Sequence, residues 1–279
     1  MDRIKIRDLE VYAYHGVNPE EKENGQHFYV NADLYLDLSK AGKTDELTAT
    51  AHYGHVCKTI TRVMQAQSYD LIERAAEVTA EAILKEYPVV REVRVEVKKP
   101  EAPVKLPFGM ISVEVTRGWK EAVVAVGGNL GDTEATIADA VRMLAEDPNV
   151  RVLRQSSLIR TKAWGKTDQP DFTNGALLLE TLYQPEELLD VLQSAEQQAG
   201  RVRKEKWGPR TLDLDLIFYE DQVIRTERLT VPHPLMQERL FVLDPLCEIC
   251  PEKLHPVYQK TVWELRERIK APSGEFKAL

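Results

Sequence analysis

The sequence lacks the features of a membrane or secreted protein. It contains no apolar run of about 18 residues, the shortest length that commonly spans a bilayer. A charged, alternating stretch follows Met1, where a signal peptide would be apolar. Cysteine is scarce, and three copies, an odd number, do not form the disulfide framework of a secreted domain. We therefore expect a cytoplasmic protein.

Two of the cysteines, Cys247 and Cys250, form a C-x-x-C sequence of the kind used in zinc and redox sites. A structural zinc site usually needs a second pair of ligands, and no pair is suitably spaced. The favoured interpretation is that these are ordinary cysteines.

An excess of positive charge is also absent, because the net charge is -8. A protein that coats nucleic acid in general needs a basic surface, so this balance argues against one. One local cluster opposes the average, and it consists of Arg201, Arg203, Lys204, Lys206 and Arg210.

The length and composition are those of a globular protein with two domains. The chain has 279 residues, of which 43% are hydrophobic and 29% are charged. At this length a single hydrophobic core commonly divides into two.

The first half of the sequence predicts two strands, two helices and two further strands. Period-two alternation of apolar residues indicates strands at residues 4–13, 28–38, 93–97 and 111–115. Helical spacing indicates one helix around Val56–Met64 and a second from Asp70 to about Tyr87.

The second half begins after a polar stretch, Arg117–Glu121, which predicts a short linker. We place the boundary near Lys120, with domains of residues 1–118 and 119–279. Strands are expected at 122–126, 150–161, 172–181 and 212–219, and helices at 133–146 and 185–199. This βαββαβ order is that of the ferredoxin-like split fold, an α+β fold with an antiparallel sheet.

The densest chemistry lies in R-V-R-K-E-K-W-G-P-R-T-L-D-L-D-L-I, residues 201–217. Asp213 and Asp215 are two apart, so they share one face of a strand while the intervening leucines face the core. Two such carboxylates can hold Mg²⁺, which also binds waters and substrate phosphates. The preceding arginines would supply forked donors for phosphate oxygens. A solvent-facing strand after a basic loop explains D-x-D alone, but it explains the whole combination poorly.

The segment Lys206–Ile217 resembles the signature of the hydroxymethyldihydropterin pyrophosphokinase family, and the resemblance extends from Ala122 to about Leu265. It implies that Asp213 and Asp215 bind two Mg²⁺ ions that bridge the triphosphate of ATP. It also implies in-line attack of the pterin hydroxymethyl oxygen on the β-phosphorus, with release of AMP. The residues expected at ATP are Gln193, Glu196, Arg201, Arg203, Arg210, His233 and Arg239. Arg201 and Arg210 are expected to be catalytic.

The same resemblance implies a pterin site. Its expected residues are Asn129, Thr161, Phe172, Asn174, Trp207 and Phe241. Aromatic faces and an amide suit a flat heteroaromatic ring with a hydrogen-bonding edge. Without the family, Phe172 and Phe241 could equally be core residues.

A glycine turn, A-V-G-G-N-L-G-D, leads from the first strand of this half into its first helix. Such a turn suggests a dinucleotide-binding phosphate loop. The register fails, because Val126 stands where the first glycine should be, and no parallel βαβ series follows. The turn instead resembles the pyrophosphokinase element G-S-N-L-G-D, with Gly128 in place of the serine.

Four short motifs lie in the first half: Y-H-G-V-N-P-E-E, A-H-Y-G, L-I-E-R and K-K-P-E-A-P. Each is weak alone, but in this order they resemble dihydroneopterin aldolase over nearly all of residues 1–120, with its ββααββ tunnelling fold. The resemblance implies that Lys99 is the general acid and base and that Tyr53 is its hydroxyl partner from a neighbouring subunit. Glu21 would lie near the active-site water, and Glu73, Tyr53 and Ile72 would bind the pterin.

Together the two resemblances imply a bifunctional folate-biosynthesis enzyme. Retro-aldol cleavage of dihydroneopterin, without a Schiff base or cofactor, would release glycolaldehyde and hydroxymethyldihydropterin. The second domain would consume the latter with ATP and Mg²⁺. We expect a homo-oligomer through the N-terminal domain, with neither nucleic acid nor membrane as a partner.

Three alternatives remain open. The N-terminal half could be an epimerase or an inactive scaffold beside an active pyrophosphokinase. His15, His52 and His55 could form a zinc site. A split βαββαβ fold could bind RNA, although the aromatic strand and basic sheet face which that function needs are not visible.

Overall fold

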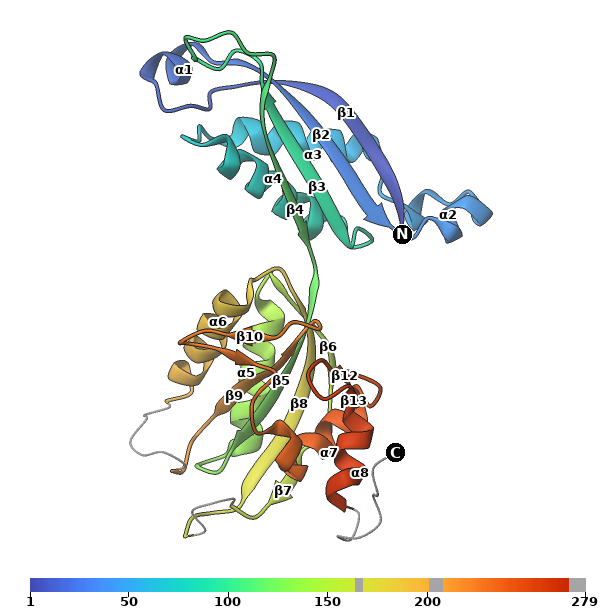
Figure 1. Ribbon diagram of the computed structural model, residues 1–279, viewed down its shortest axis with the longest axis vertical. Coiled ribbons are helices and arrows are strands. Elements are labelled where there is room, and N and C mark those ends of the chain that lie inside the picture. Colours follow the sequence, from blue (N-terminus) through green and yellow to red (C-terminus); the bar gives the residue numbers. More distant parts are fainter. Residues whose placement is uncertain (164–167, 201–207, 271–279) are drawn as a thin grey trace. The chain divides into compact units, whose positions relative to one another are not determined.

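The computed structural model describes residues 1–163, 168–200 and 208–270 (Figure 1). The chain divides into two compact units, Met1–Trp119 and Lys120–Leu279. The linker predicted between them is almost absent, because only Trp119 separates strand β4 (Ile111–Gly118) from strand β5 (Lys120–Gly128). The linker was predicted because the residues at the end of β4 and the start of β5 are polar, as loop residues commonly are.

The first unit is built on one antiparallel sheet with the strand order β1-β2-β3-β4. Its other strands are β1 (Asp2–Ala13), β2 (Gln26–Leu36) and β3 (Glu92–Lys99). All four strands lie where alternation predicted them. The antiparallel α+β architecture is therefore confirmed for this unit.

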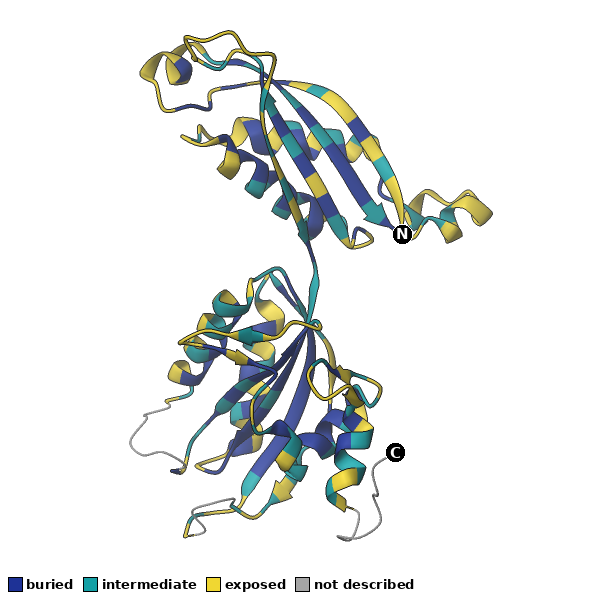
Figure 2. Cartoon of the chain, in the orientation of Figure 1, coloured by how far each residue is buried: buried dark blue, intermediate teal, exposed yellow. Residues whose placement is uncertain are grey.

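Two helices, α3 (Tyr53–Ala66) and α4 (Ile72–Glu86), cover one face of this sheet (Figure 1). Helix α3 packs on β1, and α4 packs on β3 and β4. Inward side chains such as Val30 and Val95 are fully buried, and Figure 2 shows burial alternating along the strands. Removal of this apolar surface from water holds the two layers together.

Three short elements of the first unit were not predicted. They are α1 (Pro19–Asn24), α2 (Ser39–Thr44) and a 3₁₀ helix (Leu47–Ala49). Helix α1 begins with proline, whose fixed φ suits the first helical turn. It matters for function because Glu21, its third residue, is buried.

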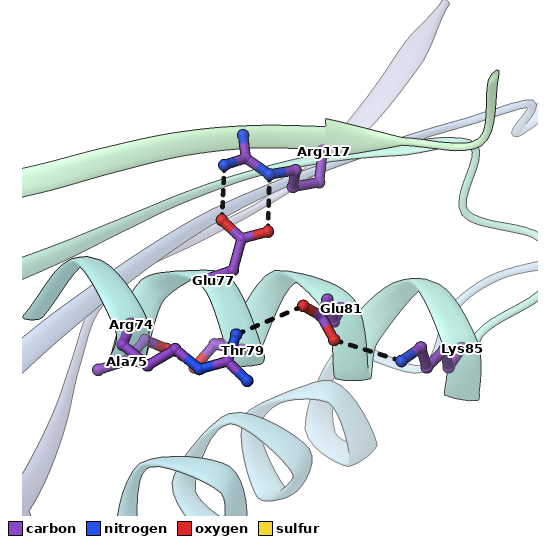
Figure 3. A network of polar contacts seen from close by, with 7 residues as sticks. All are labelled: Arg74, Ala75, Glu77, Thr79, Glu81, Lys85 and Arg117. Atoms are coloured by element: carbon purple, nitrogen blue, oxygen red, sulfur yellow. Dashed lines mark hydrogen bonds and ion pairs between the residues drawn. The ribbon is translucent and has the colours of Figure 1, made fainter. Parts of the chain in front are cut away.

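The edge strand β4 is tied to helix α4 by a two-point ion pair (Figure 3). Arg117 Nε lies 2.7 Å from Glu77 Oε1, and Arg117 Nη2 lies 2.5 Å from Glu77 Oε2. On the same helix, Glu81 accepts from Lys85 at 3.3 Å. The planar guanidinium matches the carboxylate, so this contact fixes the orientation of β4 as well as its distance from α4.

The second unit contains an antiparallel sheet with the order β6-β8-β5-β9. Its other strands are β6 (Val150–Gln155), β8 (Phe172–Thr181) and β9 (Asp213–Tyr219). The single strand expected at 150–161 is wrong, because a separate strand β7 (Ile159–Thr161) follows β6. Between them, Ser156 N donates to the carbonyl oxygen of Ala176 (3.0 Å), and Ser156 Oγ accepts from Ala176 N (2.9 Å).

Helices cover both faces of this sheet. The predicted helices α5 (Thr133–Glu146) and α6 (Pro185–Gln198) form one core with it. Two helices beyond the predicted elements, α7 (Leu240–Ile249) and α8 (Val262–Lys270), form a second core on the opposite face. The apolar residues of β5 and β8 are therefore buried on both sides, as Figure 2 shows.

Short elements complete the second unit: β10 (Ile224–Arg225), β11 (Thr230–Val231), a 3₁₀ helix (Met236–Glu238), β12 (Leu254–His255) and β13 (Lys260–Thr261). No helix in the described part of the chain has both the length and the apolar character to cross a membrane.

The C-x-x-C pair lies at the end of α7, and both thiols are free. Burial raises the pKa of Cys250 to about 12, so this thiol stays protonated at neutral pH. Within the described ranges no group of three or more His, Cys, Asp or Glu side chains could hold a metal ion. The structure therefore gives the zinc interpretation of this pair no support.

Candidate active sites

A buried ion pair forms the centre of the first unit's candidate site. Lys99 is the last residue of β3, and its Nζ lies 2.5 Å from Oε1 of Glu21. Their side chains are only 10% and 8% exposed. Lys99 Nζ also donates to the carbonyl oxygen of His15 at 3.4 Å. Buried charges are stable only when paired, so each of these side chains holds the other in place.

Glu21 is bound on three sides. Besides Lys99, it accepts hydrogen bonds from Asn18 N and Gln26 Nε2, each at 3.1 Å. Burial alone would raise the pKa of Glu21, but the bonds from Lys99, Asn18 and Gln26 outweigh it and lower the pKa. The carboxylate therefore stays ionised at neutral pH beside the ammonium group.

Gly16 makes room for this carboxylate. Its φ of +153° is one that side chains rarely adopt, and a Cβ atom built there would lie 2.3 Å from the carboxyl carbon of Glu21. No other residue fits without moving Glu21, which explains the glycine in Y-H-G-V.

The three histidines of the zinc alternative do not form a site. His15 is fully buried against Phe28 and Tyr69, and burial lowers its pKa to about 4. His52 stacks on His55 with ring centroids 4.3 Å apart, and its Nδ1 caps α3 by accepting from Gly54 N. Because the described residues contain no cluster of three metal-ligating side chains, the structure does not support zinc here.

The other residues expected at this site lie at the starts of helices α3 and α4. Tyr53, the first residue of α3, is 67% exposed. Glu73 is exposed in the first turn of α4, and the neighbouring Ile72 is buried. In the described part of the chain, neither Tyr53 nor Glu73 makes a hydrogen bond to Lys99 or Glu21.

A cavity lies at one end of the second unit's sheet. Eight residues expected at ATP or pterin line it: Thr161, Phe172, Asn174, Arg210, Asp213, Asp215, Arg239 and Phe241. They come from segments far apart in the sequence, namely β7, β8, β9 and the region around α7. The fold therefore brings most of the predicted set into one pocket.

One part of the cavity is charged. Asp213 and Asp215 are half-buried on one face of β9, whereas Leu214 and Leu216 are buried in the core, as the alternation predicted. Arg210 forms an ion pair with Asp213. Burial lowers the pKa of Arg239, and the nearby Asp215 and Asp213 oppose this shift. Two carboxylates beside two guanidinium groups can hold a cation together with a polyanion.

Another part of the cavity is aromatic and amide-lined. Phe172 and Phe241 contribute rings, and Asn174 Nδ2 donates to Thr161 Oγ1 at 2.8 Å. A Cβ atom at Gly127 would lie 2.7 Å from Asn174 Oδ1, so the glycine lets the amide sit against β5. Such walls suit a flat ring with hydrogen-bonding atoms on its edge.

Asn129 bonds to two residues that line the cavity, and Gly128 lies close to the backbone of Thr211. Asn129 Nδ2 donates to Gln169 Oε1 (3.2 Å) and to the carbonyl oxygen of Pro170 (3.0 Å), and its Oδ1 accepts from Arg210 N (2.9 Å). These bonds join two walls of the cavity. A Cβ atom at Gly128 would lie 2.4 Å from the backbone oxygen of Thr211, which accounts for glycine where the family has serine.

His233 and two residues of α6 are also positioned near β9. Strand β9 has an irregularity at Ile217, whose carbonyl oxygen accepts from His233 N at 3.1 Å. Burial and the neighbouring Arg239 lower the pKa of His233 to about 4. Gln193 is half-buried on α6, and Glu196 Oε1 accepts from Leu214 N at 2.8 Å. Arg201, Arg203 and Trp207, also expected at this site, lie outside the described residues.

Comparison with known proteins decides the family. A family model described as 7,8-dihydro-6-hydroxymethylpterin-pyrophosphokinase matches residues 123–251. The 2-amino-4-hydroxy-6-hydroxymethyldihydropteridine pyrophosphokinase of Synechocystis sp. is 48% identical over 148 residues, which are 53% of this chain and 75% of that protein. The chain belongs to this pyrophosphokinase family. The enzyme of the same name from Methylorubrum extorquens is 45% identical over 153 residues, 55% of this chain and 95% of that protein.

The rest of the chain matches a second enzyme family. The dihydroneopterin aldolase family model covers residues 4–116. The Folic acid synthesis protein FOL1 of Dictyostelium discoideum is 30% identical over 301 residues, 98% of this chain and 45% of that protein. The chain thus spans less than half the length of that relative. The predicted combination of an aldolase and a pyrophosphokinase domain in one folate-biosynthesis chain is confirmed.

Some residues of the two candidate sites were not predicted from the sequence. Gln26 and Gly16 lie against Glu21, and Gln169 lines the cavity of the second unit. Gly16 belongs to the motif Y-H-G-V, so the motif could have indicated this residue. Gln26 and Gln169 belong to no recognisable motif, so only the folded structure shows that they lie at the candidate sites.

Proposed function

We propose that the aldolase unit cleaves dihydroneopterin by proton transfer through Lys99, with Glu21 holding the lysine in place. The 2.5 Å ion pair supports this proposal, because it fixes one ammonium group in a buried position. Gly16, Asn18 and Gln26 fix Glu21 in turn. The reduced pterin ring takes up the electrons released on cleavage, so no Schiff base or cofactor is needed.

Pterin binding in this unit is assigned to Glu73 and Ile72, with Tyr53 supplied by a second copy of the chain. Tyr53 and Glu73 are exposed at the starts of α3 and α4, where another copy can reach them. In the described sheet, β1 and β4 each have one edge without a strand partner, and such edges readily pair with further strands. These features support a homo-oligomer through the N-terminal unit, with the tunnelling fold expected of aldolases.

For the pyrophosphokinase unit, we propose that the pterin lies among Phe172, Phe241 and Asn174 and that the triphosphate of ATP lies at Asp213, Asp215 and Arg210. The single observation that carries this proposal is that these residues line one cavity. Arg239 lines the same cavity. The family resemblance also assigns His233, Gln193 and Glu196 to the ATP site. The strand order β6-β8-β5-β9 supports a ferredoxin-like topology for the unit.

The donor set fits Mg²⁺. Asp213 and Asp215 offer oxygen atoms only, and two carboxylates with substrate phosphates and waters suffice for this ion. Bound Mg²⁺ supplies neutralisation of the phosphate charge. Arg210 and Arg239 orient the phosphates for in-line attack, so catalysis depends on positioning and charge. Arg201, Arg203 and Trp207 retain the roles that the family implies.

A cytoplasmic location completes the proposal, and the free cysteines are compatible with it.

One assay tests the two sites together. The chain is incubated with dihydroneopterin, ATP and Mg²⁺, and glycolaldehyde and AMP are measured. Lys99→Ala should stop glycolaldehyde release but spare AMP formation from added hydroxymethyldihydropterin. Asp213→Ala should do the reverse. Loss of both activities in either variant would contradict two independent sites. If the unaltered chain formed AMP from added hydroxymethyldihydropterin but released no glycolaldehyde from dihydroneopterin, an epimerase or inactive N-terminal unit would be favoured.

A further inference from the structure

Glu196 is a buried carboxylate that contacts the backbone of the strand bearing the two aspartates. It lies near the end of α6 and is 4% exposed. Its Oε1 accepts a hydrogen bond from Leu214 N at 2.8 Å. Its sequence position had suggested a residue beside ATP and magnesium, but this bond points to a different task.

The bonded amide lies on the outer side of the sheet. Strand β9 is the last strand in the order β6-β8-β5-β9, and it pairs with β5 on its inner side. On its outer side, β9 has no neighbouring strand in the described sheet, so an outward N–H of Leu214 has no strand partner. Helix α6 packs on β9 and keeps water from this N–H. A buried N–H without an acceptor is costly, and Glu196 supplies the acceptor from the helix.

Leu214 is the residue between Asp213 and Asp215. Side chains alternate along a strand, so the orientation of the Leu214 peptide sets the directions of both aspartates. A charged acceptor holds this peptide more tightly than a neutral one would. The carboxylate of Glu196 therefore acts on the aspartates through the backbone.

Direct metal binding by Glu196 is not indicated by the geometry. Within the described ranges, no three His, Cys, Asp or Glu side chains come together as a metal site, so Glu196 does not join Asp213 and Asp215 as a third ligand. We propose that Glu196 is a positioning residue that orients Asp213 and Asp215 for Mg²⁺ through the Leu214 amide. This inference rests on the proposed role of the two aspartates.

The first test needs no ligand. Amide hydrogen exchange of Leu214 is measured by NMR in the metal-free full-length chain, and the unaltered protein should show strong protection. Glu196→Leu removes the acceptor and should speed exchange at Leu214 by about tenfold or more, since a hydrogen bond to a charged group contributes at least that factor. Glu196→Gln keeps an acceptor oxygen and should change the rate less. Gln197→Leu, at the exposed neighbouring position on α6, is the matched control and should have no effect.

The second test measures Mn²⁺ binding in the presence of ATP by electron paramagnetic resonance. Glu196→Leu should weaken binding by about tenfold or more, and Glu196→Gln should restore most of the affinity. Equal losses in both variants would overturn the proposal, because they would mean that the charge itself binds the metal. An unprotected Leu214 amide in the unaltered protein would also overturn it, even if Glu196→Leu failed to fold. Unchanged Mn²⁺ affinity in Asp213→Asn would instead refute the proposed metal site, while the exchange result would still stand.

Discussion

The buried Lys99–Glu21 pair predicts a strong energetic coupling between two residues that lie far apart in the sequence. The perturbation is a double-mutant cycle with Lys99→Met and Glu21→Gln. Each single change leaves one charge in a site where the side chains are about one-tenth exposed. In Glu21→Gln, Lys99 would lose the carboxylate charge but keep the carbonyl oxygen of His15 at 3.4 Å. In Lys99→Met, Glu21 would keep its bonds from Asn18 N and Gln26 Nε2.

The expected magnitude follows from burial. Removal of one partner of a buried ion pair costs about 3–5 kcal/mol. The double variant contains no unpaired charge, so it should lose less than the sum of the single losses, with a coupling of about 2 kcal/mol. Urea-dependent hydrogen exchange followed by mass spectrometry measures the free energy of unfolding, because peptides from residues 1–119 report the aldolase unit separately.

The chain provides a matched control. Lys22 Nζ also lies 2.5 Å from Asp70 Oδ1, but these side chains are 43% and 62% exposed. The corresponding cycle with Lys22→Met and Asp70→Asn should give a coupling of at most about 1 kcal/mol. If the Lys99–Glu21 cycle were additive, or no larger than the control, the argument from burial would be refuted.

Three further predictions concern Gly16, Gly128 and Glu21. Gly16→Ala should displace Glu21 and reduce glycolaldehyde release while AMP formation continues, because the new Cβ atom would lie 2.3 Å from the glutamate. Gly128→Ala should lower AMP formation but spare the aldolase, since its Cβ atom would press on the Thr211 backbone at 2.4 Å. The lowered pKa of Glu21 contributes stability above about pH 4.3, the ordinary value for glutamate, and this contribution is lost as the pH falls through the folded-state pKa. The unfolding free energy of residues 1–119 should therefore depend less on pH in Glu21→Gln.

Regular elements could be predicted because their local patterns agree with their tertiary surroundings. Helix α5 and strand β8 have the predicted bounds, Thr133–Glu146 and Phe172–Thr181. The aspartates of β9 face the cavity because alternation alone decides which side of a strand a residue occupies. The break between β6 and β7 could not be predicted, since it depends on Ser156 meeting Ala176 of another strand.

In the candidate sites too, local motifs could be recognised in the sequence but contacts between distant segments could not. Motifs identified Lys99 and Glu21 separately, but their pairing requires α1 and β3 to meet, and no local pattern encodes that contact. Glu196 was identified by position, whereas its bond to Leu214 depends on how α6 lies against the edge strand. Sequence motifs therefore select candidate residues, whereas the contacts that each one makes follow from the fold.

The single residue between β4 and β5 has a consequence for how long the two enzymes stay together. Trp119 N donates to the carbonyl oxygen of Arg91, and strand structure resumes at Lys120. Proteases cut most readily in exposed, unstructured chain, and this junction offers very little of it. The junction should thus resist cleavage, so that each chain keeps one aldolase and one pyrophosphokinase throughout its lifetime.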